Sequence, residues 1–168
     1  MIVISDTTPI ISLLKAERLD LLQKLYKVVL VPQAVYKELI NNPQYAKEAD
    51  IIKTTEFLSV MDVENRKSVA VLRSVSGLDA GESEALIMYD EQKADLLLID
   101  EHKGRSIAKQ LNVRYIGTAG ILMLSYDKGL ISAAEVKRCM DIMIENGIRL
   151  SRKLCNTVMV YVGLTEQY

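Results

Sequence analysis

The chain has 168 residues, of which 49% are hydrophobic and 26% charged, and its formal net charge is −1 at pH 7. This length and composition predict a single globular domain over residues 1–168, and the near-neutral charge excludes a globally basic surface for nucleic acid. No apolar run reaches the roughly 20 residues of a membrane span, and the first residues lack a secretory-signal pattern, so we expect no membrane partner and a cytoplasmic location.

The cysteines and the single histidine narrow the possible chemistry. Cys139 and Cys155 show no CxxC spacing, so they are expected to fill the core of a protein in a reducing compartment. His102 is the only histidine, which excludes most histidine-based zinc sites. It also excludes the usual serine–histidine or cysteine–histidine nucleophile unless His102 itself takes part.

Short apolar or β-branched segments alternate with longer helical patterns along the chain. Strands are expected, in chain order, at residues 1–5, 27–32, 57–63, 95–100 and 113–117. Helices are expected at residues 7–26 (as one or two), 33–42, 44–56, 66–75, 78–94, 101–112, 118–130, 132–146 and 151–161. This alternation predicts an α/β fold, a three-layer α/β/α sandwich with a central parallel sheet of four to five strands, and residues 132–168 as C-terminal helices.

Two of the expected strands end in an aspartate. Asp6 follows "VIS" and Asp100 follows "LLLI". In an open parallel sheet, ligands bind beyond the carboxyl ends of the strands, where the strand order reverses, so the two carboxylates converge there if their strands are neighbours. The alternative for each is a helix cap, Asp6 at the helix that opens at residues 7–9 and Asp100 at the helix that opens at Glu101.

A glutamate on the helix at 33–42 adds a third carboxylate. Glu38 lies between Val35 and Leu39, which places it at the edge of the apolar arc of that helix. A carboxylate there is costly to bury unless a partner neutralises it. The alternative is an exposed side chain that reaches water.

A second glutamate, Glu82, begins the helix at 78–94. It lies three residues after Asp79, a spacing that also fits a capping box in which Glu82 reaches back to the amide of Asp79. Glu84 falls about 200° round the helix from Glu82, so we expect the two not to share a role.

Four carboxylates brought together repel one another, and burial without a partner raises their pKa values. A hard divalent cation supplies the missing positive charge, and all-oxygen ligands favour Mg²⁺ or Mn²⁺ over zinc. Such an ion turns water into a nucleophile and neutralises charge on a phosphodiester. The candidate metal ligands are Asp6, Glu38, Glu82 and Asp100.

Four stretches, in this order, resemble a PIN domain, and most closely the prokaryotic subgroup similar to VapC-type toxins: "VISDTTPIISL", "LVPQAVYKEL", "LDAGESEALIMYDEQKADLLLIDE" and "VRYIGTAGILMLSYDKGLI". The resemblance runs from Ile2 to about Leu130, and "ENGIRLSRKL" resembles the C-terminal helices of that subgroup. It implies a PIN-like fold and a ribonuclease whose acidic quartet lies at the carboxyl edge of a parallel sheet.

The resemblance also implies roles for individual residues. The first aspartate of the quartet falls on Asp6, the helix glutamate on Glu38 and the last aspartate on Asp100. The third acid, commonly an aspartate in the wider family, falls on Glu82 by its spacing to Asp100. Thr7 corresponds to the small hydroxyl residue that assists the site, which makes these five the expected catalytic residues. Glu101 stands where some members carry an additional acid.

The resemblance implies a metal-dependent enzyme that hydrolyses RNA, the toxin of a toxin–antitoxin pair, with a small antitoxin protein as partner and a homodimer as its common form. The alternative is a non-catalytic PIN-like binding module that a protein partner regulates. A phosphatase of the haloacid-dehalogenase kind also begins with an aspartate after a strand, but it requires a second aspartate where this chain has Thr8.

Basic residues near the two aspartates are candidates for contacting RNA phosphates, with an ordinary solvated surface as the alternative. They are Lys15 and Arg18 after Asp6, and Lys103, Arg105 and Lys109 after Asp100. Because the chain has one phenylalanine, no tryptophan and eight tyrosines, platforms for stacking bases are scarce, and we expect specificity to depend on RNA shape.

Overall fold

The computed structural model describes residues 1–165, so residues 166–168 of the predicted C-terminal region lie outside the described residues. The five predicted strands are all present: β1 (Val3–Ser5), β2 (Val29–Pro32), β3 (Leu58–Met61), β4 (Leu96–Leu98) and β5 (Tyr115–Ile116). The helices are α1 (Thr7–Lys15), α2 (Asp20–Tyr26), α3 (Gln33–Asn41), η1 (Pro43–Tyr45), α4 (Ala49–Thr54), α5 (Arg66–Ser76), α6 (Ala80–Glu91), α7 (His102–Gln110), α8 (Thr118–Asp127), α9 (Ala133–Glu145) and α10 (Arg152–Tyr161).

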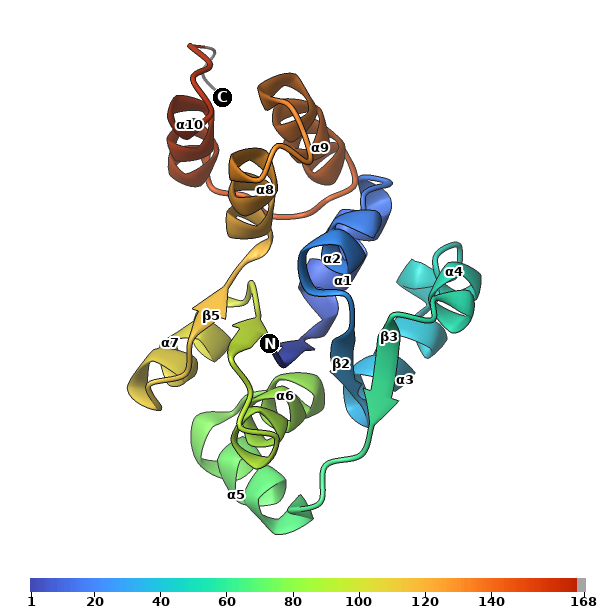
Figure 1. Cartoon of the computed structure of the whole chain (residues 1–168). Helices are drawn as coiled ribbons and strands as arrows, with labels where there is room; N and C mark the ends of the chain where they lie inside the picture. Colours follow the sequence, from blue (N-terminus) through green and yellow to red (C-terminus); the bar gives the residue numbers. More distant parts are fainter. Residues whose placement is uncertain (166–168) are drawn as a thin grey trace.

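The strands form one parallel sheet in the order β3-β2-β1-β4-β5. Figure 1 shows this sheet through the middle of the molecule, with α5 and α6 on one side and α1, α2 and α8 to α10 on the other. The predicted α/β/α sandwich around a parallel sheet is therefore confirmed. The chain runs outward from β1 to β2 and β3 and then places β4 on the other side of β1, so the strand order reverses between β1 and β4.

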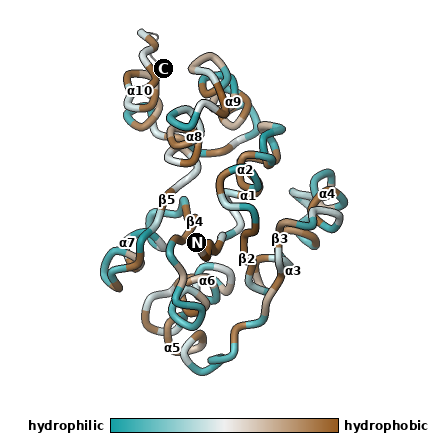
Figure 2. Tube along the Cα trace, viewed as in Figure 1, coloured by the Kyte–Doolittle hydropathy of each residue, from teal (hydrophilic) through white to brown (hydrophobic). Residues whose placement is uncertain are grey.

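Alternating side chains along the strands build one core cluster on each face of the sheet. Val3 of β1 and Leu98 of β4 pack with apolar residues of α1, α2, α8, α9 and α10. Their neighbours Ile4 and Leu97 point to the opposite face and pack with residues of α5, α6 and α7. Figure 2 shows the strands as mainly hydrophobic. Burial on both faces explains why these strands are continuous apolar runs in the sequence.

The segment from 44 to 56, predicted as one helix, is instead the short 3₁₀ helix η1 followed by α4. The side chain of Asn42 accepts a hydrogen bond from the amide of Gln44 at 3.0 Å, and Pro43 follows at once. An Asx-type turn of this kind competes with a regular helix. The consequence is that Tyr45 ends a tight turn rather than lying on a helix face.

The apolar residues of α8 and α9 are mostly core. Leu122 of α8 and Met140 of α9 are fully buried. Cys139 and Cys155 are buried and unpaired, as the sequence predicted. Within residues 1–165, no helix has both the length and the apolar character needed to cross a membrane.

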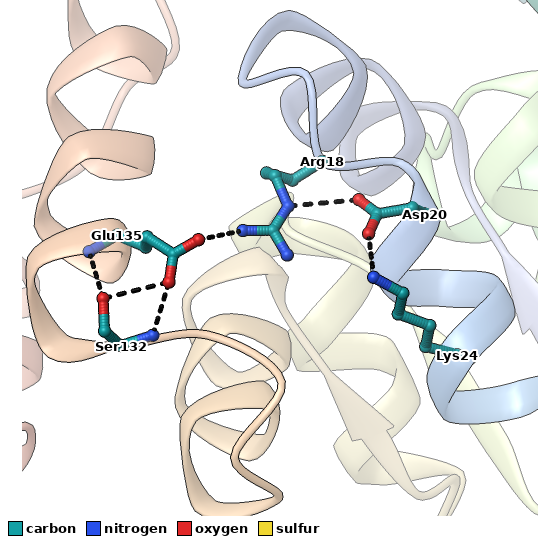
Figure 3. A network of polar contacts seen from close by, with 5 residues as sticks. All are labelled: Arg18, Asp20, Lys24, Ser132 and Glu135. Carbon is teal, nitrogen blue, oxygen red and sulfur yellow. Dashed lines mark hydrogen bonds and ion pairs between the residues drawn. The ribbon is translucent and has the colours of Figure 1, made fainter.

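A network of polar contacts joins the turn between α1 and α2 to the beginning of α9 (Figure 3). Arg18 donates to Asp20 and to Glu135, each at 3.1 Å, and Lys24 donates to Asp20 at 2.7 Å. Glu135 also completes a capping box with Ser132 at the start of α9. These contacts hold the beginning of α9 against the end of α1, and both ion pairs of Arg18 belong to them.

Candidate active site

Asp6 lies at the point where the strand order reverses. It follows β1 directly, and its amide donates to the carbonyl of Leu98 in β4 at 2.9 Å. Strand β1 is also paired with β4 through Ser5 and Leu98. The carboxylate of Asp6 is therefore placed beside the carboxyl ends of both strands, where parallel sheets bind ligands.

Asp6 stands at the start of α1 and is buried. The residue occupies the N-cap position of α1, yet its side chain makes no capping hydrogen bond. It is only 4% exposed. Burial raises the pKa of Asp6 well above its ordinary value; the amide of Thr7 opposes this, and the charges of Asp79, Glu82 and Glu38 add to it. A carboxylate buried among like charges is what a site for a cation requires.

Glu38 reaches the same place from α3. Its side chain is half-buried, and Oε2 accepts a hydrogen bond from the hydroxyl of Thr7 at 2.7 Å. Thr7 is itself buried at the first position of α1. The helix-edge position predicted for Glu38 therefore brings its carboxylate to α1, next to Asp6, rather than out to water.

Glu82 makes the capping box that the sequence allowed. Its Oε2 accepts from the amide of Asp79 at 3.1 Å, and Oδ1 of Asp79 accepts from the amide of Glu82 at 2.8 Å. Glu82 is nevertheless buried and lines the same cleft as Asp6. Burial raises the pKa of Glu82, which the backbone hydrogen bond from Asp79 opposes; the charges of Asp79 and Glu101 raise it further and that of Lys103 lowers it.

These side chains line a cleft of about 290 Å³ at the carboxyl edge of the sheet. Five carboxylates face it, together with two threonines, one tyrosine and one lysine. The lining residues are Asp6, Thr7, Thr8, Glu38, Tyr45, Asp79, Glu82, Glu101 and Lys103. We call this the acidic cleft. It brings together four of the five predicted site residues.

Asp100 is the exception, because it is turned toward the N-terminus of α8. Its Oδ1 accepts from the amide of Thr118 at 2.8 Å and its Oδ2 from the Thr118 hydroxyl at 2.5 Å. A side chain at Gly117 would lie 2.6 Å from Oδ1, so this approach requires glycine. Asp100 does not line the acidic cleft, and it does not cap α7, whose N-cap is Glu101.

The electrostatics of Asp100 resemble those of Asp6. Burial raises the pKa of Asp100, the two hydrogen bonds from Thr118 and the charge of Arg105 oppose the rise, and Glu101 adds to it. Asp100 is thus a mostly buried carboxylate with neutral partners. Asp100 follows β4, the strand that pairs with β1, after one intervening residue, Ile99.

Glu84 serves a different purpose from Glu82, as its angle on the helix predicted. Its Oε2 accepts from the amide of Ala34 at 2.8 Å, and its Oε1 forms an ion pair with Arg66 at 2.5 Å. Glu84 is buried and does not line the acidic cleft. It ties α6 to α3 and α5, and it offers a control carboxylate on the same helix as Glu82.

The acidic cleft suits a hard cation in its chemistry, but the side chains are not arranged as a finished metal centre. Its carboxylates supply only oxygen ligands, and the pKa of Asp6 is raised by burial first and then by the charges of Asp79, Glu82 and Glu38. Among the described residues, however, no three histidine, cysteine or acidic side chains converge closely enough to hold one ion. The donor set fits a hard divalent cation, and binding requires the side chains to draw together.

The sequence missed two features of this site. The sequence indicated Asp79 only as a helix cap, yet Asp79 also faces the cleft. Its spacing to Glu82 could have indicated this position. Tyr45 faces the cleft because the turn at Asn42 directs it there, and no sequence pattern indicated that.

A family model described as PIN domain matches residues 2–163, nearly the whole chain. The protein therefore belongs to the PIN-domain family. PIN domains are typically nucleases that use divalent metals, so the family and the acidic cleft both indicate a hydrolase acting on nucleic acid. No curated protein and no solved structure matches the chain.

Proposed function

We propose that the protein is a metal-dependent ribonuclease that hydrolyses RNA phosphodiester bonds. The observation that carries the proposal is the gathering of Asp6, Glu38 and Glu82 in one cleft at the reversal of strand order, in a chain of the PIN-domain family. Ligands of open parallel sheets bind at this position. Without a bound cation, three neighbouring carboxylates repel one another and destabilise the fold.

We assign Asp6, Glu38, Glu82 and Asp100 to the ligation of Mg²⁺ or Mn²⁺. Such an ion, when bound, activates water and neutralises charge on the phosphate. Thr7 keeps the Glu38 carboxylate beside Asp6 through its hydroxyl. Thr118 fixes Asp100 through both carboxylate oxygens, each of which retains a lone pair for a second partner.

The test is incubation of mixed cellular RNA with and without Mn²⁺, followed by sequencing of the fragment ends. Wild type should produce Mn²⁺-dependent fragments with 5′-phosphate ends, Asp100→Asn should produce none, and Glu84→Gln should cleave like wild type if it folds. Thermal unfolding of each variant separates lost catalysis from lost structure. Identical fragments from wild type and Asp100→Asn would overturn the proposal.

A second candidate function is a PIN-like binding module without catalysis. The observation in its favour is that no three acids of the described chain converge on a single point as the side chains lie. Isothermal titration of the protein with Mn²⁺ distinguishes the two. Binding by wild type that Asp6→Asn removes supports the nuclease, whereas absence of binding by wild type supports the module.

We further propose a role as the toxin of a toxin–antitoxin pair, a homodimeric state and a cytoplasmic location, all of which rest on the resemblance to VapC-type toxins. Induced expression in a bacterial host should arrest growth for wild type and not for Asp100→Asn. Co-expression of a small antitoxin encoded beside the gene should restore growth. Light scattering on the purified chain measures whether it is a dimer.

A further inference from the structure

The acidic cleft contains one positive charge among its carboxylates. Lys103, exposed near the start of α7, is the only basic residue among the described residues that line the cleft. Its ammonium nitrogen donates to the carbonyl of Gly77 at 2.7 Å, and its charge lowers the pKa of Glu82. Lys103 therefore points into the cleft rather than away from it.

Lys103 differs from the other basic residues predicted to contact phosphates in where its side chain lies. Lys15 forms an ion pair with Glu48 at 3.3 Å, and Arg18 is shared between two acids. Arg105 lies over the ring of Tyr115, 5.4 Å from its centre. Lys109 is exposed at the far end of α7. Of the five, Lys103 alone lines the cleft.

The partner that holds Lys103 is a neutral backbone carbonyl, and within residues 1–165 no carboxylate of the cleft forms an ion pair with it. Gly77 ends α5 in the left-handed conformation with φ +65°, and a side chain there would lie 2.8 Å from the ammonium nitrogen. The contact therefore positions the ammonium ion, whose charge also acts on the nearby carboxylate of Glu82. Its remaining N–H donors are available for an anion that enters the cleft.

The topology places this cation on one flank of the site. Strand order runs β2-β1-β4, so Asp6, after β1, lies between the start of α3, which follows β2, and the start of α7, which follows β4 and carries Lys103. A chain of nucleotides that crosses the cleft past Asp6 passes Lys103 as well. The nearest group of such a chain that an ammonium ion binds strongly is a phosphate.

We propose that Lys103 is the phosphate-binding residue of the acidic cleft, and that its ammonium ion contacts an RNA phosphate adjacent to the bond that is cut. The proposal rests on the nuclease function proposed above and deepens it by naming how a polyanion binds beside five carboxylates. Lys103 binds the RNA and not the metal. Its removal should therefore weaken the binding of RNA and strengthen the binding of the metal ion.

The test compares wild type with Lys103→Gln, Lys103→Arg and Lys109→Gln. Lys109→Gln removes the same charge from the same helix outside the cleft, and so measures the long-range effect of charge alone. Binding of a short fluorescein-labelled single-stranded RNA of mixed sequence is followed by anisotropy in Ca²⁺ over a series of salt concentrations. Isothermal titration of each protein with Mn²⁺ and thermal unfolding accompany it.

Lys103→Gln should weaken RNA binding by roughly five- to tenfold at low salt and reduce the slope of log affinity against log salt by about 0.7, the value for one phosphate contact on a single strand. It should strengthen Mn²⁺ binding, because a positive charge beside the acids is removed. Lys103→Arg should retain the salt slope, and Lys109→Gln should leave both affinities near those of wild type.

An unchanged salt slope in Lys103→Gln, or the same loss of RNA affinity in Lys109→Gln, would overturn the proposal even if the protein cleaves RNA. The opposite combination gives a different result. If Lys103→Gln lowers the affinity for RNA but the wild-type protein never cleaves RNA, the phosphate-binding role of Lys103 is supported and the nuclease function is contradicted. Failure of wild type to bind RNA overturns both.

Discussion

Thr118 donates its amide to one carboxylate oxygen of Asp100 and its hydroxyl to the other, at 2.8 and 2.5 Å. Thr118 is 1% exposed. The second acid at the carboxyl edge of the sheet is thereby tied to α8, whereas the side chain of Asp6 makes no N-cap hydrogen bond in α1 and meets the amide of Thr7. Asp6 directly follows β1 and Asp100 follows β4 after Ile99, and the two carboxylates are held in different ways.

Replacement of the Thr118 hydroxyl tests how firmly Asp100 is held. Thr118→Val should lower the free energy of unfolding at pH 7 by about 1.5–3 kcal/mol, because a hydrogen bond to a mostly buried carboxylate is lost. Thr118→Ser keeps the hydroxyl and should lose much less. Urea unfolding of both variants provides the measurement, and equal stability of the valine and serine variants would contradict it.

The charge of Asp6 should cost stability when no cation is present. Asp6→Asn in EDTA at pH 7 should unfold at the same temperature as wild type or a few degrees above it, since each kcal/mol shifts the Tm of a domain of this size by about 2–4 °C. It should also lose the rise in Tm that Mn²⁺ gives to wild type. A large destabilisation in EDTA would show instead that Asp6 is a structural residue.

Much of this arrangement could be predicted from the sequence, because it follows from local pattern. A run of apolar residues ending in aspartate indicates each strand and places Asp6 and Asp100 after it, and the spacing from Asp79 to Glu82 defines the capping box. That pattern did not indicate that Asp100 turns toward α8 and away from the acidic cleft. The tether from Thr118 to Asp100 could not be predicted, since it joins residues 18 positions apart, on either side of the segment that contains α7 and β5. The direction of Tyr45 likewise depends on a turn that replaces a predicted helix.

The raised pKa of Asp6 predicts how the stability difference between Asp6→Asn and wild type depends on pH. The pKa of Asp6 in the folded chain lies above its ordinary value of 3.8. Protonated Asp6 therefore contributes to the stability of the fold in full below pH 3.8, and this contribution is lost as the pH rises through the raised pKa. The gain in stability from Asp6→Asn in EDTA should therefore be small at pH 4 and grow toward pH 7. Thermal unfolding of both proteins in matched buffers measures it, and a gain that shrinks as the pH rises would contradict the assignment.

Gly104 on α7 controls the distance between that helix and Glu82. A side chain at this position would lie 2.8 Å from Oε1 of Glu82 and against the side chain of Ile99, which is fully buried. Gly104→Ala should therefore destabilise the fold by about 1–3 kcal/mol through overpacking, although alanine favours a helix. It should also displace Glu82 and weaken Mn²⁺ binding, whereas Ser106→Ala on the exposed face of α7 should change neither. Calorimetric titration with Mn²⁺ and urea unfolding check both effects, and a Gly104→Ala variant with wild-type metal affinity would exclude Glu82 from the metal site.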